Sequence, residues 1–270
     1  MKITQFYRPD PIRLTLKTIS AVLALGISIG ACASPPGVSG TSWKEEVLLH
    51  DGSRFIVKRS QSYGGRHEIG QSAPVREHTI SFALPNSGKT YSWTSEYGED
   101  LGRTNFNLLA LHILNGIPYL VVEPNLCLSY NKWGRPNPPY VFFKYDGKSW
   151  QRISLSEFPA EFRSINLIVN NGREKEITRL ASKSGYVSSE GVEEINSSLD
   201  QPEYRGILRE GLTKERIKEM CVEMVSNGKG GWYSIDWFTS EPTYEACLKV
   251  CERKKMPPQE CPCAALFKGK

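Results

Sequence analysis

The sequence lacks both an apolar run long enough to cross a membrane and a clear excess of one charge. The apolar run Thr18–Ala31 has about 14 residues, whereas a helix that crosses a hydrocarbon layer of ~30 Å needs about 20. Residues 1–31 hold four of the 34 basic residues and one of the 29 acidic residues, so the rest of the chain has 30 Lys and Arg against 28 Asp and Glu. This balance argues against a nucleic acid as a partner, because nucleic-acid-binding proteins display basic surfaces.

Histidine is scarce as well, since the chain has only four: His50, His67, His78 and His112. None of them has the two-histidine helical spacing of a zinc hydrolase. His67 and Glu68 fit an exposed strand end better than half of an acid–base pair, and His112 in an apolar run predicts a buried core residue. We therefore expect no cofactor, no metal and no obvious catalytic residues. A hydrolase whose site is assembled from scattered residues stays open as an alternative.

The N-terminus has the layout of a bacterial export signal, with a basic segment, an apolar run and small residues in that order. The signal is predicted to span residues 1–31. Its last residues and the next one, Ile29-Gly30-Ala31-Cys32, resemble the lipobox of bacterial lipoproteins. The resemblance implies that Cys32 is acylated after cleavage and anchors the chain in a lipid bilayer. An ordinary secretory signal or a short uncleaved anchor is the alternative.

The residues after the cysteine predict a tether in the cell envelope. Ala33 stands where many lipoproteins of the inner membrane have Asp, so the resemblance implies the outer membrane, with the body of the protein in the periplasm. Residues 32–42 are rich in Pro, Gly and Ser and show no hydrophobic period. Ten such residues reach at most ~30–35 Å.

Six further cysteines agree with an oxidising compartment, because an even number in an exported chain predicts disulfides. A metal site is the alternative, since two cysteine pairs lie close in sequence. The single residue between Cys261 and Cys263 fits a zinc site poorly, which favours disulfides. The candidate disulfide residues are Cys127, Cys221, Cys247, Cys251, Cys261 and Cys263.

Residues 43–170 have the pattern of an antiparallel β domain, in which short apolar or alternating runs meet turn residues. The sequence predicts four hairpins, and their number favours a meander that closes as a sandwich, a barrel or a partial propeller. The hairpins turn at Asp51-Gly52, at residues 85–88, at Asn115-Gly116 and at Asp146-Gly147.

Residues 171–270 predict a small helical part, so the expected class is α+β. Residues 170–205 are polar and predict an exposed crossing segment with one short helix. Residues 213–225 and 240–255 have apolar residues at helical spacing, and residues 232–238 predict a strand. Cysteines lie on both apolar stripes, so the two helices are expected to face each other and to be linked by disulfides.

If these helices are antiparallel neighbours, Cys221 is expected to pair with Cys247. Cys251 would then pair with Cys261 or Cys263 after the chain reverses at the Pro-Pro pair that ends the second helix. The cysteine left over would pair with Cys127 and fasten the C-terminal end to the β domain.

The segment 127–140 combines aromatic residues, cations and a proline-rich stretch, as recognition loops do. The competing interpretation is a rigid connection whose aromatic rings cap the β domain. The candidate binding residues are Tyr130, Trp133, Arg135 and Tyr140.

Three segments, 65–71, 128–136 and 244–249 with Cys261-Pro262-Cys263, resemble a group of uncharacterised proteobacterial lipoproteins. This resemblance implies a location in the cell envelope, but it assigns no activity and no site residues to this sequence. The expected function is therefore a non-catalytic, outer-membrane-anchored module that binds a periplasmic protein partner or supports the envelope. An immunity or inhibitor lipoprotein that neutralises a toxin or a hydrolase is the second hypothesis, and a periplasmic hydrolase is the third.

Overall fold

The computed structural model describes residues 40–84, 88–169 and 172–268. The expected signal peptide, Cys32 and the tether as far as residue 39 lie outside the described residues. Within the described ranges, none of the helices combines the length and the apolar character that spanning a bilayer requires.

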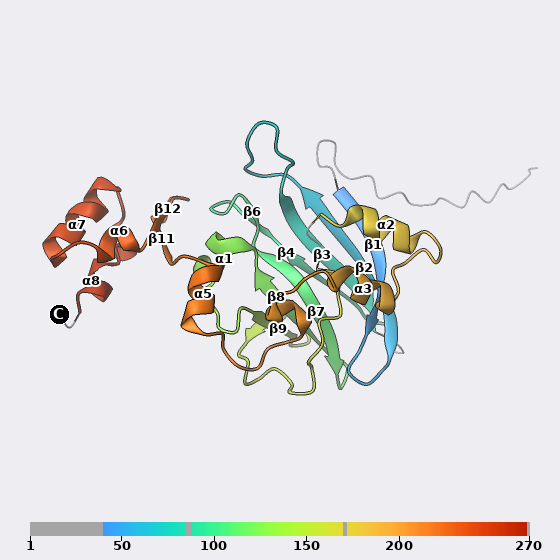
Figure 1. Ribbon diagram of the computed structural model, residues 1–270. Coiled ribbons are helices and arrows are strands. Elements are labelled where there is room, and N and C mark those ends of the chain that lie inside the picture. The colour runs from blue at the N-terminus through green and yellow to red at the C-terminus, as the bar shows by residue number, and fades with distance from the viewer. Residues whose placement is uncertain (1–39, 85–87, 170–171, 269–270) are drawn as a thin grey trace, which may run out of the picture. The chain divides into compact units, whose positions relative to one another are not determined.

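Two four-stranded antiparallel sheets form the β domain (Figure 1). Each is a meander of strands that follow one another in the chain. The first contains β1 (Gly40–Leu48), β2 (Arg54–Tyr63), β3 (Val75–Ala83) and β4 (Thr90–Ser95). The second contains β7 (Phe106–Leu114), β8 (Ile117–Pro124), β9 (Val141–Tyr145) and β10 (Trp150–Ile153), and a short ladder of β5 (Tyr97–Gly98) and β6 (Arg103–Thr104) precedes it in the chain.

The two sheets share one core, which makes the β domain a sandwich. Trp93 of β4 packs against Phe106 of β7 and Phe143 of β9, with ring centroids 6.3 and 5.8 Å apart. Val57, Ile80, Leu111 and Leu120 are fully buried in the same cluster. The expected α+β class is thus confirmed, and a sandwich is the closed form that these residues build.

All four predicted hairpins are present as antiparallel pairs: β1–β2, β3–β4, β7–β8 and β9–β10. The turn between β7 and β8 shows why they form. Asn115 and Gly116 have φ values of +52° and +72°, and a two-residue turn of this kind matches the twist of the strands it joins. Strand β1 begins at Gly40, two residues before the expected end of the tether at residue 42, because residues 40–42 pair with β2 through their backbone.

The inner face of the first sheet holds a buried ion pair. Glu45 and Arg59 are 0% and 1% exposed, and Arg59 Nη1 donates to Glu45 Oε1 at 2.8 Å. Trp43 Nε1 donates to the other carboxylate oxygen at 2.6 Å, and the backbone N–H of Ile168 donates to Oε1 at 3.3 Å. Since leaving either charge buried without its partner is strongly unfavourable, this pair ties β1, β2 and the segment around residue 168 together.

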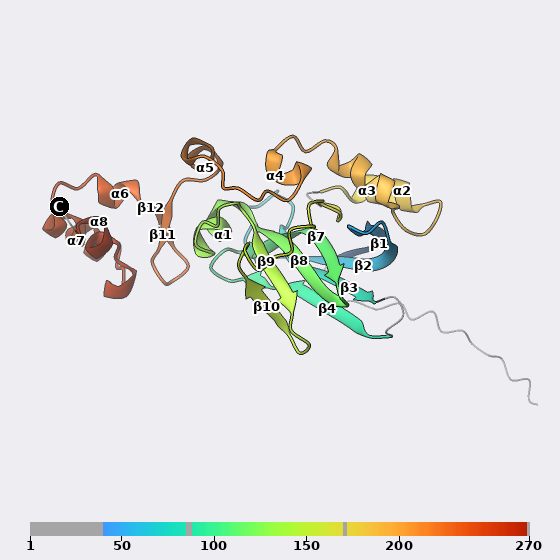
Figure 2. The ribbon, with the colours of Figure 1, turned by 90° about the horizontal axis from the view of Figure 1, so that it is seen from below.

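The predicted crossing segment is more ordered than its polar composition indicates. It contains three helices, α2 (Glu174–Ala181), α3 (Ser189–Asn196) and α4 (Pro202–Arg205), instead of one. Figure 2 shows α2 and α3 beside β1, and their apolar residues form a cluster with Trp43 and Ile168. Ile207 joins a further cluster on the outer face of the second sheet, which is therefore buried on both faces.

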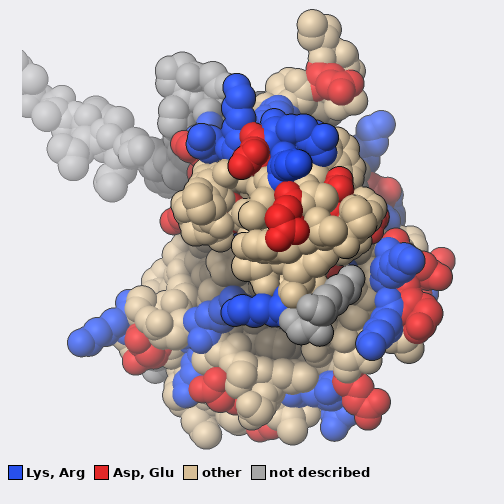
Figure 3. Space-filling model, turned by 90° about the vertical axis from the view of Figure 1, so that its left-hand side faces the viewer, with Lys and Arg blue, Asp and Glu red and all other residues tan. Residues whose placement is uncertain are grey.

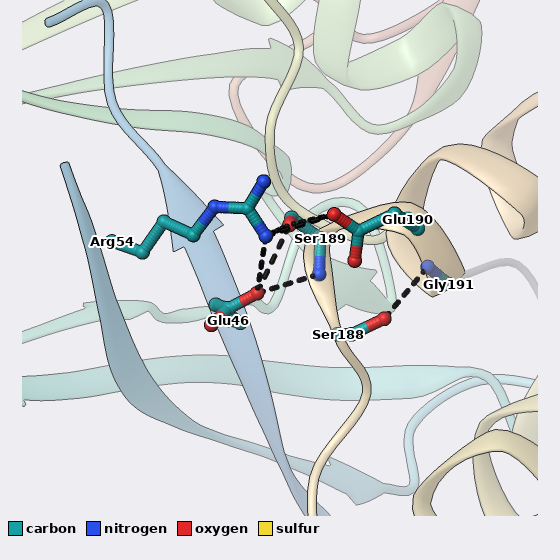
Figure 4. A network of polar contacts seen from close by, with 6 residues as sticks. All are labelled: Glu46, Arg54, Ser188, Ser189, Glu190 and Gly191. Atoms are coloured by element: carbon teal, nitrogen blue, oxygen red, sulfur yellow. Dashed lines mark hydrogen bonds and ion pairs between the residues drawn. The ribbon is translucent and has the colours of Figure 1, made fainter. Parts of the chain in front are cut away.

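A polar network fixes the beginning of α3 to β1 and β2 (Figure 4). The Ser188 hydroxyl caps the helix by accepting from a backbone N–H of its first turn at 3.2 Å. Glu46 accepts from the backbone N–H and the hydroxyl of Ser189 at 3.1 and 3.0 Å. Arg54 donates to Glu190 at 2.8 Å. Because exposed ion pairs add little stability, the network mainly orients the helix.

The C-terminal part has its own small core, made by Phe238, Val250, Met256 and four cysteines. It follows helix α5 (Lys214–Met220) and begins with a hairpin whose second strand covers only the first residues of the strand expected at 232–238. Its elements are β11 (Met224–Ser226), β12 (Trp232–Ser234), α6 (Asp236–Thr239), α7 (Tyr244–Arg253), a 3-10 turn (Pro258–Glu260) and α8 (Cys263–Leu266).

The six cysteines form three disulfides, but the expected pairing is wrong in two of the three bonds. Cys221 pairs with Cys127 and not with Cys247, which pairs with Cys263; only the bond between Cys251 and Cys261 agrees with the expectation. Helix α5 ends at Met220 instead of continuing to residue 225, and Cys221 is extended, with φ −160° and ψ 124°. Its side chain is therefore not part of a helical stripe that faces α7.

Candidate functional site

A cavity of about 420 Å³ lies where strand β8, helix α1 (Leu126–Lys132), α4 and α5 meet. We call it the acidic cavity. Its polar lining consists of two glutamates, two tyrosines and an asparagine, and its apolar lining includes two prolines and a methionine. The volume falls within the usual range of small-molecule sites. The lining residues with polar or flexible side chains are Asn107, Glu123, Tyr130, Glu203, Tyr204 and Met220.

Glu123 is placed in the cavity by the second sheet, near the end of β8. It is 7% exposed, and its Oε1 accepts from Asn107 Nδ2 at 3.0 Å. Burial raises the pKa of Glu123 to about 7; hydrogen bonding by Asn107 and Tyr204 opposes this rise, and the charge of Glu203 adds to it. Glu123 therefore holds a proton up to a higher pH than an exposed glutamate does.

Glu203 enters the cavity from α4, a short helix that Pro202 begins. It is 4% exposed, and its Oε1 forms an ion pair with Arg216 Nη2 of α5 at 3.4 Å. Its Oε2 is buried and has no hydrogen-bond partner. A carboxylate oxygen only accepts hydrogen bonds, so this atom requires a donor that the described residues do not supply.

A second buried atom of the cavity has no partner. Tyr130 of α1 is 4% exposed, and its hydroxyl makes no hydrogen bond. Burial raises the pKa of this phenol, and the positive charge of Arg135, 5.1 Å from the ring centroid, opposes the rise. Burial and the neighbouring Glu123 also raise the pKa of Tyr204, so that both tyrosines carry their protons at neutral pH.

The disulfide between Cys127 and Cys221 forms one wall of the cavity and joins α1 to the end of α5. Polar contacts reinforce this junction. Arg135 Nη2 donates to the Cys221 carbonyl at 3.0 Å, and Asn131 Nδ2 donates to the Val222 carbonyl at 3.0 Å. The wall is thus held by a covalent bond and by the hydrogen bonds beside it.

The four residues of the predicted recognition loop do not form an exposed surface. The segment begins with helix α1, and Tyr130 lines the acidic cavity. Trp133 packs on Phe106 of the sandwich core with ring centroids 4.4 Å apart, and Tyr140 is 3% exposed, with its hydroxyl donating to the Glu203 carbonyl at 2.8 Å. The structure thus shows the aromatic rings inside the β domain, as in the competing interpretation, with Tyr130 at a cavity.

Two of the four histidines lie near each other, since the ring centroids of His50 and His112 are 6.5 Å apart. His67 is exposed, and its Nδ1 lies 2.8 Å from the Gly65 carbonyl. His78 is 2% exposed on β3, and His112 is fully buried on β7, as expected. None of the four histidines lines the acidic cavity.

Three cysteines of the C-terminal part lie close enough together to bear on the alternative of a metal site. The sulfur atoms of Cys251, Cys261 and Cys263 lie within 4.8 Å of one another, a spacing that three metal ligands also have. Each of these sulfurs belongs to a disulfide in this structure. Since a metal binds the thiolate form, these residues would have to be reduced before they could serve as ligands.

Sequence reasoning missed Glu123 and Glu203. Glu123 had a usable signal, because it ends the apolar strand Ile117–Val122, where a charge has to be buried or to face a cavity. Glu203 had none, since it lies in a polar segment among many exposed charges. Its burial depends on how α4 and α5 pack on the β domain, which is tertiary information.

Figure 3 shows one face of the molecule, on which Lys and Arg side chains gather at the top of the view and basic and acidic side chains lie side by side elsewhere. Comparison with known proteins finds no matching family model, no matching curated protein and no matching solved structure. The chemistry of the site is therefore derived from its geometry.

Proposed function

We propose that this protein is a non-catalytic binding module of the bacterial envelope, anchored through acylated Cys32 and facing the periplasm from the outer membrane. Its ligand is a small molecule that occupies the acidic cavity. The export signal, the lipobox-like Ile29–Cys32 and the six paired cysteines support the address. The cavity supports the binding role.

The observation that carries the binding role is that two residues of one cavity lining each have a buried polar atom without a partner, Glu203 Oε2 and the Tyr130 hydroxyl. Buried polar groups in proteins are almost always hydrogen-bonded, and leaving one unpaired costs about 1–3 kcal/mol. A ligand that bonds to both atoms would recover this cost. The cavity is thus complementary to a small molecule with polar and apolar parts.

A hydrolase is the second candidate, and the two carboxylates favour it. Glycoside hydrolases use one protonated and one ionised carboxyl group, and Glu123 has the raised pKa of a general acid. If the protein hydrolyses a substrate, Glu123→Gln should abolish turnover and leave binding intact. Binding without product release in the wild type supports the non-catalytic role.

Filling the cavity should prevent binding. Met220 is half-buried at the end of α5, so Met220→Trp places an indole in the cavity. In NMR titrations with a set of cationic, neutral and anionic fragments, at least one should shift wild-type resonances of cavity residues, and the variant should lose the response. If no fragment binds, or if the variant binds as the wild type does, the binding role is wrong.

Replacing Cys32 should release the protein from the membrane. With Cys32→Ala no thiol remains to receive the lipid, so incorporation of labelled palmitate should fall to background and the protein should leave the membrane fraction. Ser34→Ala, two residues further on, is the matched control and should keep the label. Equal labelling of Cys32→Ala and the wild type would refute the anchor.

A further inference from the structure

We propose that the acidic cavity selects an organic cation, a protonated amine or an amidinium group on an apolar body, with Glu203 Oε2 as its principal hydrogen-bond acceptor. This inference deepens the proposed function and rests on it. It assigns the ligand's chemical class from three features of the cavity: the charge of its lining, the unpartnered acceptor and the apolar walls.

The charged side chains of the lining have one sign. Glu123 and Glu203 both line the cavity, and no Lys, Arg or His is among the lining residues. Arg216 approaches Glu203 from outside the lining and is shared with Glu219, whose Oε2 lies 3.8 Å from Arg216 Nη1. Arg135, 5.1 Å from the ring of Tyr130, also lies outside the lining and donates to the Cys221 carbonyl and to Asn131. Because the two ionisable acids of the lining have no basic residue beside them in that lining, the cavity opposes an anionic ligand and favours a cationic one.

The unpartnered oxygen of Glu203 requires a ligand group that donates a hydrogen bond. Because Oε1 is occupied by Arg216 and Oε2 is buried without a partner, this carboxylate of the cavity lining has one acceptor atom that no described residue satisfies. An N–H group of a cation provides a charge-assisted bond there, which is about twice as strong as a neutral one. The Tyr130 hydroxyl and Glu123 give further acceptors, so a group with two or three N–H donors fits best.

The rest of the lining fits an apolar body. Pro124, Pro139 and Met220 line the cavity together with the disulfide of Cys127 and Cys221. A volume of about 420 Å³ admits a small molecule or a single long side chain, but not a folded element. A free amine and a lysine side chain on a peptide share the required chemistry, and the experiment separates these two sources.

Three probes with the same phenyl group test the inference by calorimetric titration of the mature protein: 2-phenylethylamine, 2-phenylethanol and phenylacetate. The amine should bind at least tenfold more tightly than the alcohol, and phenylacetate should not bind. In Glu203→Gln, affinity for the amine should fall at least tenfold, while affinity for the alcohol stays within about twofold. Nα-acetyl-lysine amide replaces the amine in a parallel titration, and tighter binding of this probe identifies a peptide side chain as the source.

Glu215→Gln is the matched control. Glu215 is an exposed residue of α5 outside the cavity lining, so its variant removes one negative charge and should leave all affinities unchanged. Melting curves establish that Glu203→Gln is folded; if it is not, Glu123→Gln takes its place, with a smaller loss of affinity for the amine expected because Glu123 already accepts from Asn107. Equal binding of amine and alcohol in the wild type overturns the inference and leaves the proposed function standing. If none of the probes binds, including the lysine derivative, both fail.

Discussion

The double replacement Cys127→Ser/Cys221→Ser is expected to lower the free energy of unfolding by about 4–5 kcal/mol. The two cysteines are 94 residues apart, so their bond removes a long loop from the unfolded ensemble, and in the chain-entropy model the gain grows with loop length. The bond also forms a wall of the acidic cavity. Urea unfolding of the double variant under non-reducing conditions, compared with the wild type, measures the loss.

The double variant Cys251→Ser/Cys261→Ser is the control for loop length. Its cysteines are only 10 residues apart, for which the same model gives about 2.5–3 kcal/mol. The order of the two effects is the test, because both variants replace two sulfur atoms by oxygen. A larger loss from the short loop, or a loss below about 1 kcal/mol from the long one, would contradict the entropic account.

The β domain was predictable because its information is local. Each hairpin depends on a turn and on the few residues at either side of it, as Asp51-Gly52 and Asn115-Gly116 show. The sequence did not decide whether the meander closes as a sandwich, a barrel or a partial propeller. What makes it a sandwich is the packing of Trp93 on Phe106 and Phe143, contacts between strands of different sheets that no local pattern encodes.

The disulfides were predictable in number and not in pairing. The expected helix at 213–225 was too long, since the chain is extended from Cys221 and Met224 begins a strand whose backbone N–H donates to Asn131 at 2.8 Å. That contact with α1 brings Cys221 to Cys127. Partner choice was therefore decided by the end of one helix and by a contact across 93 residues.

The candidate site was predictable only at Tyr130. The aromatic-rich segment drew attention to this residue, as part of either a recognition loop or a rigid connection that caps the β domain, and its ring is buried in the lining of a cavity. Glu123 and Glu203 come from a strand and from a short helix 80 residues later in the chain, and neither belongs to a motif. Cavities of this kind arise where elements meet, so single-sequence patterns do not reveal them.

Acid is expected to unfold the protein through its two buried histidines. Burial lowers the pKa of His78 to about 3, with a further contribution from Arg59, and burial lowers the pKa of His112 to about 4. In the unfolded chain both groups titrate near 6.5. The unfolded state thus binds more protons below pH 6.5, and the stability lost as pH falls amounts to about 5 kcal/mol for His78 and about 3 kcal/mol for His112.

Glu123 acts in the opposite direction, which makes the pH dependence specific. Its pKa is raised to about 7, so between pH 4.5 and 6.5 the folded state holds a proton there that the unfolded state has released. On unfolding in this window, His78 and His112 each take up a proton and Glu123 releases one, so the chain takes up about one proton in total. The free energy of unfolding should therefore fall by about 1.4 kcal/mol for each pH unit in this window.

Two variants should change this slope in opposite directions. His78→Leu removes one titrating group, so the slope should approach zero. Glu123→Gln removes the opposing group, so the slope should double to about 2.7 kcal/mol per pH unit. Urea titrations at pH 4.5, 5.5 and 6.5 measure both slopes.

The groups around His78 are Arg59 and Gln61 on β2, Ser95 on β4 and Asn107 on β7, and only Arg59 among them is charged. Slopes that match the wild type in both variants would show that other groups carry the acid sensitivity.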